Sequence, residues 1–194
     1  MKKIFYLLMF ILSSCMQQPT INDEVEAPRL SPLTKIWIDY ANNNKEIFNN
    51  EVSRENASIL VQDMMLDSIK NNPSLLRDEQ IRFEMVYRLS SNKYIAKFHL
   101  SDTRYYCTYS NDFKVTGNII SIVDESYAIT LKDNAYYRIR DYKFEGNVNA
   151  KNIKLRDGNY LYYLPAVNEY FSCYSFSLGG IYLSELQLEL DTNE

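Results

Sequence analysis

The feature that most constrains this chain is a change of hydrophobic period at Ile81. From that residue the run IRFEMVYRL alternates, with Ile81, Phe83, Met85 and Tyr87 on one face. The alternation resumes after Ser90-Ser91-Asn92 in the run KYIAKFHL, residues 93–100. Side chains of a strand point to opposite faces in turn, so a period of two predicts strands with one buried face. The two runs therefore predict a β-hairpin.

Further strands are expected towards the carboxyl end. They lie in FKVTGNIISIV (113–123), in AYYRIRDYKFEG (135–146) and, as one or two strands, in YFSCYSFSLGGIYLSELQLEL (170–190). Gly117 interrupts the first of these runs and predicts a bulge or a sharp bend. Residues 124–134 fit either a further strand or a short helix capped by Asp124.

Two amphipathic helices are expected before the strands. The first follows Pro32 and carries an apolar stripe of Leu33, Ile36, Trp37 and Tyr40. The second is capped by Ser53, ends at Asn71-Asn72-Pro73, and carries a stripe of Ala57, Leu60, Val61, Met64, Met65 and Ile69. The paired methionines fit a soft binding groove as well, but core packing is favoured. We expect Trp37 to be buried between the helices and the sheet.

Two helices followed by a hairpin, a bent glycine-bearing strand (VTGNIISI), a connecting element and the strand YYRIRDYKFEG resemble an OB-type barrel. The chain is also similar to the small OB-like lipoproteins of Bacteroidetes. The resemblance covers residues 79–190 and implies an α+β fold, with an N-terminal helical pair (32–76) and a five-stranded antiparallel OB-like β-barrel. A β-sandwich or an open antiparallel sheet with helices is the alternative. Residues 32–194 would form a single globular domain.

The amino end resembles a bacterial lipoprotein signal. Lys2 and Lys3 precede the apolar run 4–12, which is too short to span a bilayer, and Ser13-Ser14-Cys15 resembles a lipobox. The resemblance implies that residues 1–14 are removed and that Cys15 carries a diacylglycerol and an acyl chain such as palmitate. Residues 15–31 would be a flexible tether. Met16 after the cysteine suggests the outer membrane, on its periplasmic face or at the cell surface.

The charge balance argues against nucleic acid as a partner. The whole chain has a net charge of −4, and without Lys2 and Lys3 it has 19 basic and 25 acidic residues, a net charge of −6. Nucleic-acid affinity depends mostly on basic groups that displace counterions. The sequence contains no H-E-x-x-H, C-x-x-C, G-x-x-x-x-G-K or G-x-G-x-x-G motif, and its single histidine, His99, is expected to be a solvated strand residue. We therefore expect no catalytic residues, no cofactor and no metal.

Tyrosines and cysteines supply the remaining candidate residues. Of the 17 tyrosines, Tyr105, Tyr137, Tyr142 and Tyr162 are candidate ligand contacts, because tyrosine offers a large contact area and a polar tip. The alternative for each is core filling. Cys107 and Cys173 are a candidate disulfide of an exported domain, or two buried thiols.

Together these features predict a lipid-anchored binding or interaction module of the cell envelope without catalytic activity. Its partners would be the membrane, through the lipid, and an envelope protein or glycan. The alternatives are an envelope-defence or toxin-inhibiting lipoprotein and, less favoured, a hydrolase. Size and the absence of a recognisable catalytic motif weigh against the hydrolase.

Overall fold

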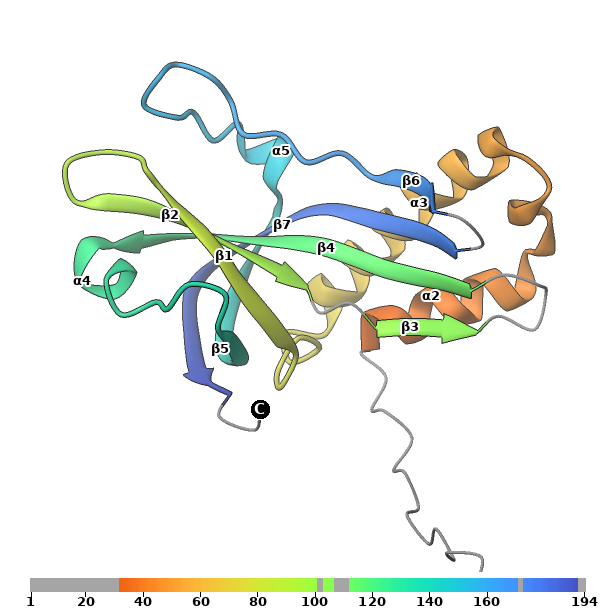
Figure 1. Cartoon of the computed structure of the whole chain (residues 1–194), viewed down its shortest axis with the longest axis horizontal. Coiled ribbons are helices and arrows are strands. Elements are labelled where there is room, and N and C mark those ends of the chain that lie inside the picture. Colours follow the sequence, from red (N-terminus) through yellow and green to blue (C-terminus); the bar gives the residue numbers. More distant parts are fainter. Residues whose placement is uncertain (1–31, 101–102, 107–111, 171–172, 192–194) are drawn as a thin grey trace, which may run out of the picture.

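The computed structural model describes residues 32–100, 103–106, 112–170 and 173–191. The first helices are α2 (Pro32–Asn43), the 3-10 helix η1 (Lys45–Phe48) and α3 (Glu51–Asn71), as expected ahead of the strands. The rest of the chain contains β1 (Gln80–Arg88), β2 (Lys93–Leu100), β3 (Thr103–Tyr106), β4 (Asp112–Asp124), α4 (Glu125–Ala128), β5 (Tyr136–Asn147), α5 (Val148–Lys151), β6 (Ala166–Tyr170) and β7 (Cys173–Leu190). Figure 1 shows α2 and α3 at the opposite end of the molecule from the β1–β2 turn and α4.

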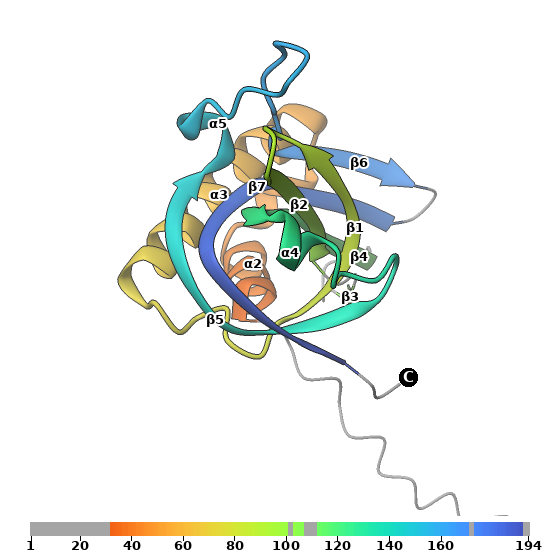
Figure 2. The ribbon, with the colours of Figure 1, turned by 90° about the vertical axis from the view of Figure 1, so that its left-hand side faces the viewer.

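Five strands form a ring. The sheet order is β3-β4-β2-β1-β5-β7-β6, and an additional pairing of β4 with β7 joins the ends of the segment β4-β2-β1-β5-β7. Figure 2 looks into this ring, with β5 and β7 curving around one side. The outer strands β3 and β6 pair with β4 and β7 respectively and lie outside the ring.

The α+β class is therefore confirmed, with two corrections. The sheet has seven described strands rather than five, and β4 pairs with β7 in parallel, so the sheet is not wholly antiparallel. The ring is not a regular barrel, because register shifts interrupt the β1–β2, β4–β7 and β5–β7 pairings. The structure fits the stated alternative, an open sheet with helices.

Helix α3 begins at a different cap from the expected one. The side chain of Asn50 accepts a hydrogen bond from the backbone N–H of Ser53 at 2.9 Å, so Asn50 is the capping residue and Ser53 lies inside the first turn. The apolar stripe is also narrower than predicted, because Leu60 and Met64 are 50% and 40% exposed. Buried Gln62 lies on the inner face instead and donates to the carbonyl oxygen of Leu178.

The main core fills the ring and extends under α2 and α3. Trp37 is 1% exposed and packs against Phe176 of β7 with 4.2 Å between ring centroids, which confirms its predicted burial. Within the ring, Phe98 lies 5.6 Å from Phe83 and 6.3 Å from Tyr137, again between centroids. Tilted and edge-on ring contacts of this kind stabilise a core beyond the area they bury.

Bulges explain where the strand pattern fails. Ile81 and Phe83 are buried as predicted, but the register of β1 against β2 shifts between Phe83 and Met85, and Met85 is 41% exposed. The expected irregularity at Gly117 is confirmed, because the β4–β7 register shifts between Thr116 and Asn118. The ambiguous segment 124–134 contains the short helix α4 and is not a strand.

A second, smaller core lies on the outer face of the ring. Its buried members are Ile95, Ile120, Val148, Ile153 and Leu161, and we call this cluster the outer core. Ile95 and Ile120 come from β2 and β4. The other three come from residues 148–165, which we call the cover segment; it comprises α5 and the loop that leads to β6, and it lies outside the ring in Figure 2. Strands β2 and β4 are thus buried on both faces.

Candidate functional site

A reciprocal pair of hydrogen bonds joins α5 to the far end of the cover segment. The side-chain amide of Asn149 donates to the carbonyl oxygen of Tyr163 at 3.0 Å, and the backbone N–H of Tyr163 donates to Oδ1 of Asn149 at 2.9 Å. Gly180 lets both ends of the cover segment pack closely on β7, since a Cβ there would lie 2.9 Å from Val148 Cγ2 and 3.0 Å from Tyr163 Cβ. Tyr163 is therefore held against the strands on a fixed backbone.

A charged pair lies under the same residue. Nζ of Lys97 is 2.6 Å from a carboxylate oxygen of Glu84 and 5.2 Å from the centroid of the Tyr163 ring. The Lys97 side chain is only 15% exposed, so its cation–π contact is partly shielded from water. Burial, with smaller contributions from Tyr87 and Glu84, raises the pKa of the Tyr163 hydroxyl to about 12. Tyr163 therefore stays neutral at physiological pH and serves as a packing residue.

The cover segment projects a tight turn beyond this anchor. Lys154 and Tyr160 form an isolated bridge, and the backbone N–H of Leu155 donates to the carbonyl oxygen of Asn159 at 2.7 Å. Gly158 adopts a φ of 92°, a conformation that favours glycine, and Asp157 accepts from the backbone N–H of Asn159 at 3.0 Å. These contacts define the conformation of the turn that carries Arg156.

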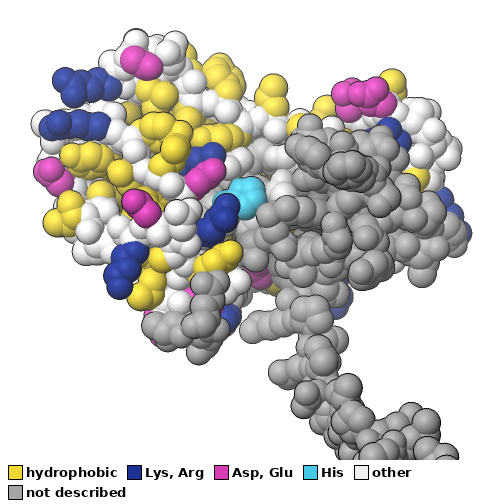
Figure 3. Space-filling model, viewed as in Figure 1, with side chains coloured by type: hydrophobic (Ala, Val, Ile, Leu, Met, Phe, Trp, Pro, Cys, Tyr) yellow, Lys and Arg dark blue, Asp and Glu magenta, His cyan; other side chains and the backbone are white. Residues whose placement is uncertain are grey.

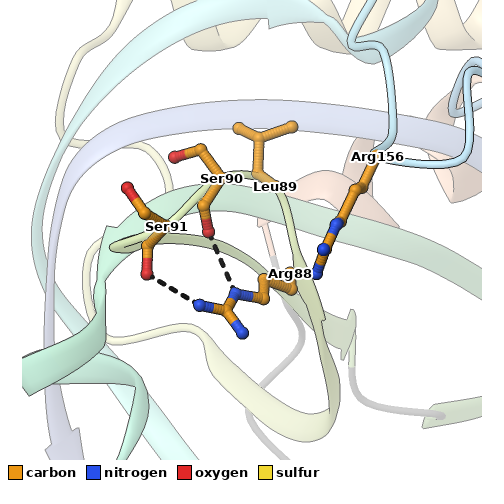
Figure 4. Close-up of a pocket in the computed structure, with 5 residues that line it drawn as sticks. All are labelled: Arg88, Leu89, Ser90, Ser91 and Arg156. Carbon is orange, nitrogen blue, oxygen red and sulfur yellow. Dashed lines mark hydrogen bonds between the residues drawn. The ribbon is translucent and has the colours of Figure 1, made fainter.

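Arg156 faces the β1–β2 turn across a hollow of about 280 Å³, lined by Arg88, Leu89, Ser90, Ser91 and Arg156. In Figure 4, Arg156 extends from the cover segment towards Arg88. The guanidinium of Arg88 donates from Nε to the carbonyl oxygen of Ser90 at 3.2 Å and from Nη2 to that of Ser91 at 3.1 Å. We call this site the arginine hollow.

An apolar stripe runs along the outside of the cover segment. Tyr160, Tyr162 and Leu164 are 47%, 60% and 69% exposed, whereas Leu161 between them is buried in the outer core. The alternation follows from an extended backbone whose successive side chains point in opposite directions. The space-filling view shows hydrophobic side chains interspersed with charged ones at the end of the molecule opposite the helices α2 and α3 (Figure 3). The stripe and the arginine hollow belong to the same segment and together form the candidate site.

The predicted tyrosines divide between this site and the core. Tyr162 is exposed on the stripe. Tyr137 and Tyr142 are buried, and their hydroxyls accept from the backbone N–H groups of Lys132 at 2.8 Å and Leu76 at 3.1 Å, so both belong to the core rather than to a ligand surface. Tyr105 lies on β3, and its side chain lies outside the described part of the structure.

The predicted cysteine chemistry stays a prediction. Cys15 and Cys107 lie outside the described residues, and Cys173 is the first residue of β7, where it pairs with Asp112 of β4 and Tyr170 of β6. Lipidation of Cys15 and a Cys107–Cys173 disulfide are therefore untested.

His99 lies on β2 opposite Arg82 of β1. Across the residues that the structure describes, no three His, Cys, Asp or Glu side chains gather as metal ligands would. Within the same residues, no helix combines the length and the apolar character needed to cross a bilayer. No protein-family model, no curated protein and no solved structure matches the chain.

The sequence analysis missed Arg88 and Arg156, which are far apart in the chain and meet only through the fold. A partial signal existed. The turn residues Asp157-Gly158 stand between the apolar pairs Ile153/Leu155 and Leu161/Tyr163, which is the pattern of a hairpin with one buried face. That pattern would have placed the turn, but not the partner of Arg156.

Proposed function

We propose that this protein is a non-catalytic binding module that a lipid on Cys15 holds to the cell envelope. The observation that carries the binding function is the exposed stripe of Tyr160, Tyr162 and Leu164. Single exposed apolar residues are ordinary, but a row of them beside a hollow is typical of an interaction surface. The partner is an envelope protein or glycan, to which tyrosine offers ring area and a hydroxyl at small entropic cost.

The packing of the cover segment supports this function. Leu161 and Tyr163 hold the inner side of the segment against the strands, so the outer side is presented on a backbone that is already ordered. A preorganised surface binds more tightly than a flexible one, because less conformational freedom is lost on association.

The test uses photo-crosslinking in cells that express the full-length protein. A benzophenone amino acid replaces Tyr162 in one variant and Val52 of α3 in a matched control; the two residues are 60% and 65% exposed. We expect a discrete crosslinked species from position 162 only, and its loss when Tyr160→Ser and Leu164→Ser are added. Identical crosslinking from both positions, or none from position 162, would contradict the proposed function.

The anchor has its own test. Cys15→Ala should abolish incorporation of labelled palmitate and leave an unprocessed precursor, whereas Cys107→Ala should change neither. Normal processing and labelling of the Cys15→Ala variant would refute the lipid anchor, and would leave the binding surface untouched.

A further inference from the structure

We propose that the arginine hollow binds a phosphate monoester group of the ligand. This inference rests on the proposed function, because Arg156 of the hollow and the exposed stripe belong to the same cover segment. At about 280 Å³ the hollow is slightly smaller than a typical small-molecule site of ~300–1,000 Å³, so it suits one compact group of a larger molecule.

The first argument is unbalanced charge. Three other arginines hold ion pairs: Arg77 with Asp141, Arg138 with Asp191, and Arg140 with Asp78 and Glu189. Among the residues that the structure describes, neither Arg88 nor Arg156 has an acidic partner, and no acidic side chain lines the hollow. Lys93 at the same hairpin is neutralised by Asp124 at 2.6 Å. Two uncompensated cations thus share one concave surface of an acidic chain.

The second argument is preorganisation. The carbonyl oxygens of Ser90 and Ser91 hold two of the donor groups of Arg88, and this fixes the plane of its guanidinium. Arginine carries five N–H donors, so three remain on Arg88, and Arg156 lines the same hollow. A planar, oriented guanidinium is well suited to the oxygens of phosphate, which it can bind through two parallel hydrogen bonds.

The third argument selects the kind of anion. A phosphate monoester carries about −1.5 to −2 charges at neutral pH, which balances two guanidinium groups, whereas a carboxylate balances only one. A nucleic-acid strand would present a phosphate at each nucleotide to a chain whose net charge is −4, with just two cations at the hollow to compensate. A terminal phosphate on a sugar or a lipid fits the site better than a polymer of diesters.

The experiment measures binding of glycerol 3-phosphate to the full-length protein in detergent by isothermal titration calorimetry at pH 7.5 and low salt, with glycerol as the neutral control. We compare the wild type with Arg88→Gln, Arg156→Gln and the matched control Arg77→Gln, which removes a guanidinium at the other end of β1. Trp37 emission verifies that each variant is folded. We expect saturable binding that weakens at least about tenfold in Arg88→Gln and in Arg156→Gln but not in Arg77→Gln.

Further arms separate the sources of the phosphate. Glucose 6-phosphate represents a sugar ligand, and short-chain dihexanoyl phosphatidic acid represents a lipid ligand. The compound that binds more tightly, and loses affinity in Arg88→Gln and Arg156→Gln, identifies the source of the phosphate. Binding should also weaken at pH 5, where a monoester loses its second charge.

Several outcomes would overturn the inference: no saturable binding of any monoester, equal binding by the two hollow variants and the wild type, or tighter arginine-dependent binding of a single-stranded oligonucleotide. If the crosslink from position 162 persists while phosphate binding fails, only the phosphate inference is lost. If phosphate binds but no crosslink forms, the proposed function is wrong instead.

Discussion

The main core and the outer core lie on opposite faces of β2 and β4, but they are built from different kinds of structure. The main core joins helices and strands, with Trp37 and Phe98 fully inside it. The outer core joins two strands to a cover segment whose only helix is the four-residue α5. Fewer buried side chains and little regular structure lower the free energy of local opening. We therefore expect the cover segment, which carries most of the candidate site, to open locally while the ring stays folded.

The largest expected effect comes from the main core. Phe98→Ala removes a ring that contacts Phe83 and Tyr137, and the cavity should lower the free energy of unfolding by about 3–5 kcal/mol. Urea denaturation followed by Trp37 fluorescence and by circular dichroism should show one coincident shift. Val86→Ala, at an exposed position of β1, is the control and should change stability by less than about 0.5 kcal/mol.

Truncation in the outer core should act more locally. Leu161→Ala should cost about 2–3 kcal/mol, the lower part of the range for a buried leucine, because the segment can relax around the cavity. Hydrogen exchange at the amides of Leu161 and Tyr163 should accelerate much more than exchange in β2. Equal acceleration in both places would show that the two cores open together and would break the comparison.

Adding volume to the outer core should have a smaller effect. In Gly180→Ala the new methyl group meets Val148 and Tyr163 at about 3 Å, and we expect a loss of about 1–2 kcal/mol with displacement of the cover segment. Gly117→Ala is the matched control, because its nearest neighbour would lie at an ordinary 3.6 Å. Thermal melts of the two variants compare them directly, and a larger loss in Gly117→Ala would contradict the assignment.

The last effect appears only at alkaline pH and is absent at neutral pH. Because burial raises the pKa of Tyr163 to about 12, its contribution to stability is complete below the ordinary tyrosine pKa of about 10. That contribution is lost as the pH rises from there through about 12. Tyr163→Phe should flatten this part of the stability profile and remove one late step from the tyrosinate absorbance titration. An unchanged titration would show that Tyr163 is not held in the outer core.

Sequence patterns predicted the main core well and the outer core poorly. The alternation with a period of two placed Ile81 and Phe83 inside correctly, because a strand with one buried face leaves a clear alternation. The alternation in KYIAKFHL puts Ile95 on the face of β2 that carries Lys97, yet Ile95 is fully buried, since the cover segment packs over that face. The consecutive apolar residues Ile119 and Ile120 indicate a strand that is buried on both faces. They do not indicate which segment covers the outer face.

The candidate site was predicted only in part. Tyr162 was expected to contact a ligand and is exposed, but Tyr137 and Tyr142 are buried because their hydroxyls satisfy backbone N–H groups from distant or irregular segments. Such contacts leave no periodic signal. The arginine hollow forms where the β1–β2 turn and the turn that carries Arg156 come together. No local sequence pattern predicts that these two turns are neighbours.

The parallel pairing of β4 with β7 also has a consequence for the order of folding. β7 follows every strand with which it pairs, namely β4, β5 and β6, so a chain that emerges amino end first cannot close the ring until β7 has appeared. Contacts between residues so distant in the chain slow folding, and for topologies of this kind folding takes roughly milliseconds to seconds. Until β7 has appeared, the edges of β4 and β5 that β7 covers in the folded protein stay unpaired, and such edges favour aggregation.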